Sequence, residues 1–254
     1  MCTMKSSFLL ILFLSVVTMS CGTKPSTNKD SLKVVTTNED KAAMPVLEKS
    51  KVVEIDNSAD FIPDNYIQFD KTLGDLNKDG LDDCVLIIKK TDKAAIEKDD
   101  EGKEIDRNRR GIVILISNGK QYEKCLENLD CFSSENEDGG VYYAPELYID
   151  IQNGNLLIGY AHGRYGYWTH TFRKKENDFE LIGYDASENR GPIVMHEISI
   201  YYLTGKKIEE TNTNEEAEEE GQEKFKSSTT KLKSSKPYYL SAIKDFDSFS
   251  APIE

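Results

Sequence analysis

The sequence predicts an all-β domain, because segments rich in β-branched and aromatic residues alternate with turn signals and no long segment has helical periodicity. The expected strands are residues 66–69, 84–89, 111–117, 147–151, 155–161, 167–173, 179–184 and 197–203. The Asn-Gly pairs at 118–119 and 153–154 are strong hairpin signals, since a type I′ turn needs two adjacent residues with positive φ. We therefore expect an antiparallel meander, either a sandwich or a partly covered sheet, with few short helices, one of them near residues 241–246.

Two of the expected strands are apolar at every position, residues 84–88 (CVLII) and 112–116 (IVILI). A strand with one solvated face alternates apolar and polar residues, so these two strands should be covered on both faces and lie centrally. The segment between them, near residues 89–110, is almost entirely charged. We expect it to form a long exposed hairpin loop.

The N-terminus carries an export signal. Lys5 precedes an apolar run at residues 8–17, which has the length of a signal-peptide core and is too short to span a bilayer. A small-residue region then leads into Cys21 and resembles the lipobox of bacterial lipoproteins, with Thr18 at the position where leucine is usual. The resemblance implies cleavage before Cys21, its lipidation and firm membrane anchoring. The alternative is an ordinary secretory signal that happens to precede a cysteine.

These features divide the chain into a signal peptide (1–20), a polar flexible tether (21–50) and a single β-rich domain (51–254). A second charged tract near residues 208–236 is rich in glutamate and then in lysine, and we expect an exposed loop whose lysine-rich part can return as an edge strand. The chain has 45 acidic and 32 basic residues, a net charge of −13. This charge argues against nucleic acid as a partner.

The stretch 74–88 has the spacing D-x-N-x-D-G-x-x-D, in which alternate oxygen-bearing side chains can converge around a tight turn, as a calcium ion requires. The candidate ligands are Asp75, Asn77, Asp79, the carbonyl of Leu81, and Asp83. The loop resembles the calcium loops of FG-GAP-type, integrin-like propeller repeats, which implies a structural calcium ion. A single copy argues against a full propeller. The alternative is an acidic turn whose side chains cap their own backbone without an ion.

The densest aromatic stretch, residues 160–173, is a candidate binding surface. Its residues are Tyr160, His162, Arg164, Tyr165, Tyr167, Trp168 and His170. Period-two geometry places Arg164, Trp168 and His170 on one face, and Tyr165 and Tyr167 on the other. Such a hairpin can form a carbohydrate- or peptide-binding platform, or its aromatic side chains can belong to the core.

The remaining reactive side chains give few signals. Cys125 and Cys131 can form a disulfide in an exported protein, or remain two free thiols. Cys84 lies inside an apolar run and is expected to be buried, and the three scattered histidines are expected at the surface rather than in a zinc site. No motif for a catalytic triad, a phosphate-binding loop or a zinc protease is present.

The whole chain resembles bacterial lipoproteins that join a lipobox to a single GDLNxDGxxD hairpin and a β-rich body, a resemblance that implies no reaction. We expect a non-enzymatic, lipid-anchored protein of the bacterial cell envelope, at the outer membrane and facing the periplasm or the surface. Its expected partners are the membrane, through the lipid, and an unidentified protein or glycan. The rival hypotheses are a carbohydrate- or peptide-binding module using residues 160–173, a hydrolase of envelope polymers, and an inhibitor or immunity-type lipoprotein with a protein partner.

Overall fold

The computed structural model describes residues 56–137, 144–233 and 236–250. The expected signal peptide, the tether and Cys21 lie outside the described residues. Within the described part, the regular elements are strands and short 3-10 helices, and the sheets are antiparallel, which confirms the all-β prediction. None of the helical turns in this part of the chain has the length and hydrophobicity that a membrane span requires.

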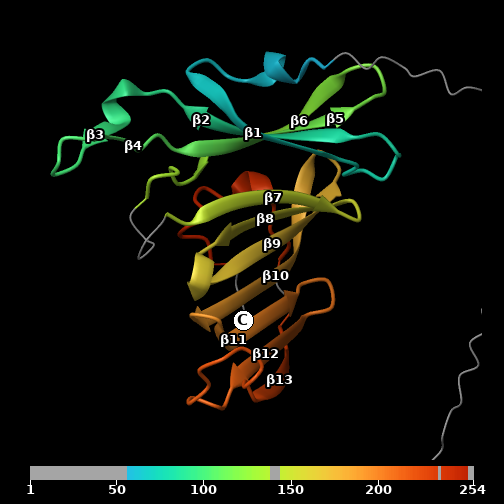
Figure 1. Cartoon of the computed structure of the whole chain (residues 1–254). Coiled ribbons are helices and arrows are strands. Elements are labelled where there is room, and N and C mark those ends of the chain that lie inside the picture. Colours follow the sequence, from blue (N-terminus) through green and yellow to red (C-terminus); the bar gives the residue numbers. More distant parts are fainter. Residues whose placement is uncertain (1–55, 138–143, 234–235, 251–254) are drawn as a thin grey trace, which may run out of the picture. The chain divides into compact units, whose positions relative to one another are not determined.

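The first sheet has four strands in chain order (Figure 1). They are β1 (Tyr66–Gly74), β2 (Asp83–Lys90), β5 (Arg110–Ser117) and β6 (Tyr122–Phe132). The charged segment between β2 and β5 contains a 3-10 turn, η2 (Lys93–Ala95), and a two-stranded ribbon of β3 (Ile96–Lys98) and β4 (Glu104–Asp106). The expected loop is therefore a small hairpin that extends from the sheet.

The second sheet has seven strands and is also a simple meander. Its strands are β7 (Glu146–Gln152), β8 (Asn155–Ala161), β9 (Gly166–Lys175), β10 (Asp178–Arg190), β11 (Ile193–Tyr201), β12 (Lys206–Asn212) and β13 (Phe225–Lys231). The β7–β8 turn has Asn153 at φ 53° and Gly154 at φ 72°, the two positive values that a type I′ hairpin needs. The charged tract 208–236 contributes to β12 and to β13, which is an exposed edge strand.

The two sheets pack face to face around one apolar core, so the fold is a sandwich. The core residues are Val85, Ile87, Ile112, Ile114, Leu126 and Phe132 from the first sheet, and Leu156, Ile158, Tyr160, Phe172, Phe179 and Leu181 from the second. The opposite faces of β2 and β5 are buried as well, beneath a segment that contains η1 (Ser58–Phe61) and contributes Phe61 and Ile62. This arrangement confirms that the two uniformly apolar strands are covered on both faces.

The segment 238–250 closes the sandwich at one side, and Figure 1 shows it in red behind β7. Its 3-10 turn η4 (Leu240–Ala242) packs against β10 and β6, one strand from each sheet. The side-chain amide of Asn128 donates to the carbonyls of Leu240 and Ile243, at 2.9 and 2.8 Å. The backbone N–H of Phe246 donates to the carbonyl of Cys131 at 3.0 Å. These bonds join the segment to β6, and its apolar side chains complete the core.

Of the two alternatives for Cys125 and Cys131, a disulfide or two free thiols, the structure has the free thiols. Both residues lie in β6, where six residues of extended chain span about 20 Å. A disulfide needs Cα atoms within about 7 Å of each other. Cys84 is fully buried, as expected, and burial raises the pKa of its thiol to about 11.

Candidate functional site

A cavity of about 140 Å³ lies on the core-facing side of the second sheet. Its walls are mainly aromatic, and they come from three adjacent strands and the segment 238–250. The lining residues are Trp168 and His170 from β9, Tyr184 from β10, Ile200 from β11, Tyr202, and Phe246, Asp247, Phe249 and Ser250. We call this cavity the aromatic pocket.

Strand pairing explains why these side chains meet. Across the sheet, His170 is opposite Tyr184, and Tyr184 is opposite Ile200, so the three form one row on the same face. Trp168 is two residues before His170 in β9 and therefore shares that face. The segment 238–250 then places Phe246 over the row, with its ring 6.2 Å from Trp168 and 5.8 Å from His170, centroid to centroid.

His170 is at the centre of this aromatic group. Its ring centroid lies 4.8 Å from that of Tyr184, 5.0 Å from Trp168 and 5.3 Å from Phe249. The residue is only 3% exposed, and its Nδ1 atom has no hydrogen-bond partner. Burial lowers the pKa of the imidazole from 6.5 to about 3, so the ring is neutral near neutral pH. The expectation of a surface histidine is wrong for this residue.

Tyr202 is the second unusual group of the aromatic pocket. Its hydroxyl is buried and has no hydrogen-bond partner, and burial raises its pKa. A buried polar atom without a partner costs about 1–3 kcal/mol, and native structures contain few of them. In the described part of the chain three side chains have such an atom, and two of them, His170 and Tyr202, line this cavity. Two of the three unpartnered groups are therefore gathered beside one cavity.

Asp247 lies at the rim of the aromatic pocket and is solvent-exposed. Desolvation by the surrounding protein raises the pKa of its carboxyl, and the nearby negative charge of Asp245 adds to the effect. Arg109 is the neighbouring basic side chain, and its guanidinium donates to Asp245 at 2.7 Å. Asp247 therefore places a carboxylate beside the opening, where the Ser133 side chain hydrogen-bonds to it and Arg109, paired with Asp245, also attracts it.

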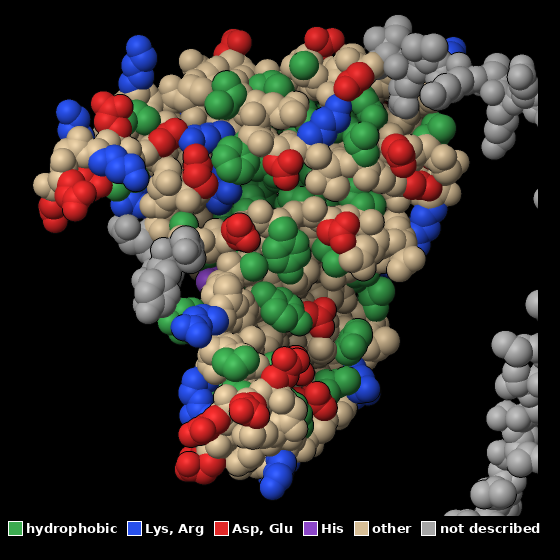
Figure 2. Space-filling model, viewed as in Figure 1, with side chains coloured by type: hydrophobic (Ala, Val, Ile, Leu, Met, Phe, Trp, Pro, Cys, Tyr) green, Lys and Arg blue, Asp and Glu red, His purple; other side chains and the backbone are tan. Residues whose placement is uncertain are grey.

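The expected aromatic binding surface is divided by the fold. Trp168 and His170 face the aromatic pocket, whereas Tyr160 is a core residue whose hydroxyl lies 3.2 Å from the hydroxyl of Ser133. Tyr165 and Tyr167 are 43% and 41% exposed. Tyr167 lines a shallow groove on the opposite face of the sheet, with Asp185 and Glu197. Figure 2 shows Asp and Glu side chains interspersed with hydrophobic ones over this sheet.

Arg164 and His162 lie outside the strands. Arg164 is exposed within the 3-10 turn η3 (Gly163–Tyr165), so it does not share the face of Trp168. His162 is the half-buried residue that precedes this turn, and burial lowers its pKa. It does not meet His170, which pairs with Ile158.

Sequence reasoning did not identify the other pocket residues. Tyr184, Ile200 and Tyr202 belong to β10, β11 and the following turn, and nothing in those segments distinguishes them from core residues. The stretch DFDSF at 245–249 contributes Phe246, Asp247 and Phe249. Its alternation of aromatic and acidic residues is the one sequence signal that could have indicated a site here.

The predicted calcium loop is a turn that caps its own backbone. The carboxylate of Asp75 accepts hydrogen bonds from the backbone N–H groups of Lys78, Asp79 and Gly80, at 2.5, 3.2 and 2.9 Å. Asn77 Oδ1 accepts from the N–H of Asp79 at 3.0 Å. Gly80 has φ 87°, which the sharp turn requires. The turn thus gathers the side-chain oxygens of Asp75, Asn77 and Asp79.

Asp83 has a different position, because it is fully buried. One carboxylate oxygen accepts from the N–H of Leu76 at 2.8 Å and the other from the N–H of Ser117 at 2.9 Å. Burial raises the pKa of this carboxyl, and the charges of Asp79 and Asp75 add to the effect. Asp83 therefore joins the loop to β5, and it is the side chain of the expected ligand set that fits an ion least well.

The carboxylates, histidines and cysteines of the described residues form no group of three or more arranged for a metal. Calcium also binds amide and backbone carbonyl oxygens, which such a group does not include, so the finding is compatible with a calcium ion in this loop. Asp75, Asn77, Asp79 and the carbonyl of Leu81 fit such an ion in their chemistry. The calcium site stays a prediction.

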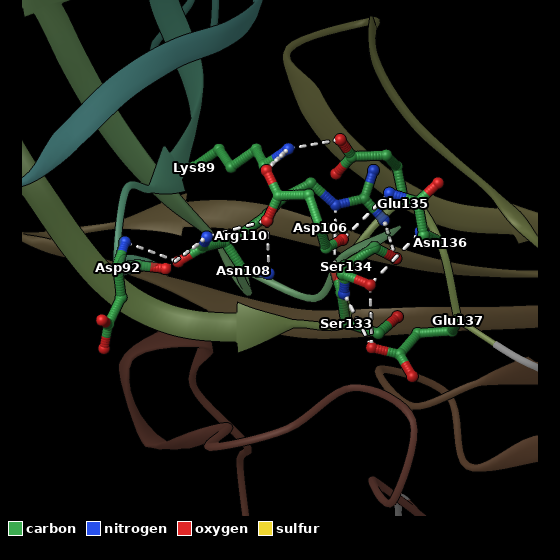
Figure 3. A network of polar contacts seen from close by, with 10 residues as sticks. All are labelled: Lys89, Asp92, Asp106, Asn108, Arg110, Ser133, Ser134, Glu135, Asn136 and Glu137. Atoms are coloured by element: carbon green, nitrogen blue, oxygen red, sulfur yellow. Dashed lines mark hydrogen bonds and ion pairs between the residues drawn. The ribbon is translucent and has the colours of Figure 1, made fainter. Parts of the chain in front are cut away.

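A network of polar side chains surrounds the base of the β3–β4 hairpin (Figure 3). Lys89 pairs with Asp106 at 2.5 Å and with Glu135. Burial lowers the pKa of Lys89, but its two carboxylate partners outweigh this effect and raise it. Arg110 donates to the carbonyls of Ser133 and Ser134, at 2.8 and 3.2 Å. These contacts fix the hairpin to the segment after β6, which is a structural role.

The aromatic pocket is thus the strongest candidate site in the described part of the chain. It combines a partly open cavity, two residues with unpartnered polar atoms and an exposed carboxylate. Comparison of the chain with protein-family models, with curated proteins and with solved structures found no match.

Proposed function

We propose that the protein is a non-enzymatic, lipid-anchored binding protein of the bacterial cell envelope, and that its ligand site is the aromatic pocket. One observation carries the proposal: His170 and Tyr202, each with a buried polar atom that has no hydrogen-bond partner, both line one cavity. Ligand sites are typically concave and apolar, with a few polar groups that fix the ligand's orientation. Both atoms have almost no accessible surface, so a guest must turn the neighbouring side chains to reach them, and it then removes the cost of leaving them unpaired.

The state of His170 favours binding over proton transfer. An efficient general base has a pKa near the working pH, whereas burial holds the pKa of His170 at about 3. The imidazole is therefore a hydrogen-bonding group of fixed neutral charge. Its nearest neighbours are aromatic rings, which supply contact area and shape.

The size of the cavity limits the ligand. A cavity of about 140 Å³ is close to the roughly 150 Å³ that accepts one benzene-sized molecule. The site therefore suits one small molecule, or a single side chain of a peptide. A flat sugar platform would instead use exposed rings, and the exposed rings Tyr165 and Tyr167 lie away from the pocket.

Two further parts of the proposal rest on the sequence. The lipobox-like segment around Cys21 supports attachment of the protein to a membrane. The loop pattern supports a structural calcium ion held by Asp75, Asn77, Asp79 and the carbonyl of Leu81. With Asp83 engaged in the core, few protein ligands remain and water would complete the shell, so the affinity should be in the millimolar range of weak extracellular sites.

The binding proposal can be tested with the one tryptophan of the chain, Trp168, which lines the aromatic pocket. A panel of small amines, aromatic acids, sugars and short peptides is titrated while the Trp168 fluorescence and its indole N–H resonance are followed. We expect at least one compound to change both signals saturably, and Phe249→Ala to weaken its binding at least tenfold.

Tyr167→Ala is the matched control for this titration, because Tyr167 is on the opposite face of the same strand. This variant should bind as the wild type does. Binding that is lost in Tyr167→Ala but kept in Phe249→Ala would move the site to the outer face and refute the proposal.

A further inference from the structure

We propose that the aromatic pocket recognises an organic ammonium group, either the side chain of a lysine in a partner or a free alkylamine. This inference rests on the proposed function of the pocket as a ligand site and names the chemical class of the ligand.

The polar groups of the aromatic pocket match a ligand that only donates hydrogen bonds. A neutral imidazole keeps one ring nitrogen as an acceptor, the hydroxyl oxygen of Tyr202 can accept, and the carboxylate of Asp247 accepts. None of the residues that line the cavity is a lysine or an arginine. A primary ammonium group has three N–H donors and no acceptor, so its donors match these three acceptors in number, whereas a quaternary ammonium group supplies the positive charge alone.

The aromatic walls add a second contribution. A cation within about 6 Å of a ring centroid is attracted by the electron-rich face of the ring, most strongly for tryptophan. The lining includes the rings of Trp168, Tyr184, Tyr202, Phe246 and Phe249. Trp168 and Phe246 lie nearly parallel, with 7° between their planes. Several rings around one small cavity form the kind of cage that holds methylated or alkyl ammonium groups.

Charge outside the cavity favours the same ligand. The exposed carboxylate of Asp247 lines the cavity beside Ser133 and Arg109, and the guanidinium of Arg109 is paired with Asp245 at 2.7 Å. The chain as a whole carries a net charge of −13, which raises the local concentration of cations. An anionic ligand would meet a carboxylate at the opening and no basic side chain in the lining.

The test uses choline and its neutral isostere 3,3-dimethylbutan-1-ol, which have the same shape and differ in charge. Each is titrated at constant ionic strength into the full chain, with Trp168 fluorescence as the readout. We expect choline to bind at least tenfold more tightly than the isostere. Asp247→Asn should weaken choline binding at least fivefold, whereas Glu197→Gln, a charge change in the groove on the opposite face of the sheet, should not alter it.

A second arm distinguishes the two sources of the ammonium group. Choline is compared with a short peptide that contains one trimethyl-lysine, and with the same peptide that contains norleucine instead. Tighter binding of the trimethyl-lysine peptide would identify a protein partner, and tighter binding of choline would identify a small-molecule ligand. Either result supports the ammonium assignment.

Three results would overturn it. Equal binding of the neutral isostere would leave the aromatic pocket as a ligand site but remove the role of charge. Choline binding that persists unchanged in both Asp247→Asn and Phe249→Ala would place the cation elsewhere. Absence of any choline signal, with a saturable Trp168 response to a neutral compound of the broader panel, would refute the ammonium group and keep the proposed function.

Discussion

The unpartnered hydroxyl of Tyr202 makes an unusual prediction, namely that its removal stabilises the protein. Tyr202→Phe deletes one buried oxygen that has no hydrogen-bond partner and leaves the ring in place. Leaving such a group unsatisfied costs about 1–3 kcal/mol. Deleting it enlarges the cavity slightly and forfeits up to about 1 kcal/mol of packing. The net expectation is a gain of about 1 kcal/mol in the free energy of unfolding.

Tyr160→Phe is the matched control. Its hydroxyl is equally buried, but it lies 3.2 Å from the hydroxyl of Ser133, so its removal breaks a hydrogen bond and should cost about 1 kcal/mol. Both variants are measured by urea unfolding with Trp168 fluorescence, and by thermal melting. For a domain of this size, 1 kcal/mol corresponds to about 2–4 °C in melting temperature. The two variants should therefore shift in opposite directions.

A loss of stability in Tyr202→Phe comparable to that in Tyr160→Phe would refute this reasoning, because it would mean that a water molecule in the cavity already satisfies the hydroxyl. If the gain is found, the same variant should bind a primary amine such as butylamine more weakly than the wild type, because the ammonium group then loses one hydrogen-bond acceptor. The pocket would then be a place where stability is given up for ligand recognition.

Four other predictions follow from the structure and the sequence. Asp83→Ala leaves the N–H groups of Leu76 and Ser117 unpaired and should cost about 3 kcal/mol in chemical denaturation, whereas the exposed neighbour Asp82→Ala should cost less than about 0.5 kcal/mol. Because the pKa of His170 falls from 6.5 in the unfolded chain to about 3 in the fold, its contribution to stability is complete above pH 6.5 and is lost as the pH falls toward 3. The loss at pH 5 should be about 2 kcal/mol, and His170→Leu should flatten that part of the wild-type profile. Millimolar calcium should raise the melting temperature relative to EDTA, and Asp79→Ala should abolish the difference; equal melting curves for the wild type would rule out a calcium site. Cys21→Ala should release the protein from membranes into the soluble fraction, and retention of this variant in washed membranes would contradict lipidation at that residue.

Local signals were enough to predict most of the fold. The apolar runs in β2 and β5 indicated central strands, and both are buried on two faces. Asn153 and Gly154 indicated a hairpin because the requirement for positive φ depends on those two residues alone. β6 was missed because bulges opposite β5 shift its register twice and destroy the period-two pattern. Without that strand, the sequence left a disulfide between Cys125 and Cys131 open, which the extended chain of β6 excludes.

The candidate site could be predicted only in part. The density of aromatic residues at 160–173 drew attention to Trp168 and His170, which do line the aromatic pocket. Its other walls come from residues 184–202 and 246–250, and the pairings that bring these segments together are not encoded in any one of them. His170 lacks a hydrogen-bond partner only because these segments surround it in the folded protein, so the sequence alone could not reveal this.

The position of segment 238–250 has a consequence for the order of folding. Asn128 makes its two hydrogen bonds with residues 112 and 115 positions later in the chain, and Arg109 meets a carboxylate 136 positions away. Contacts of such long sequence separation form late and slowly. The hairpins of both meanders can form as soon as their strands are available, but the core closes only when residues 238–250 dock. The part of the core that contains Leu240, Ile243 and Phe246 should therefore be the last to form, because it needs residues from both ends of the described chain.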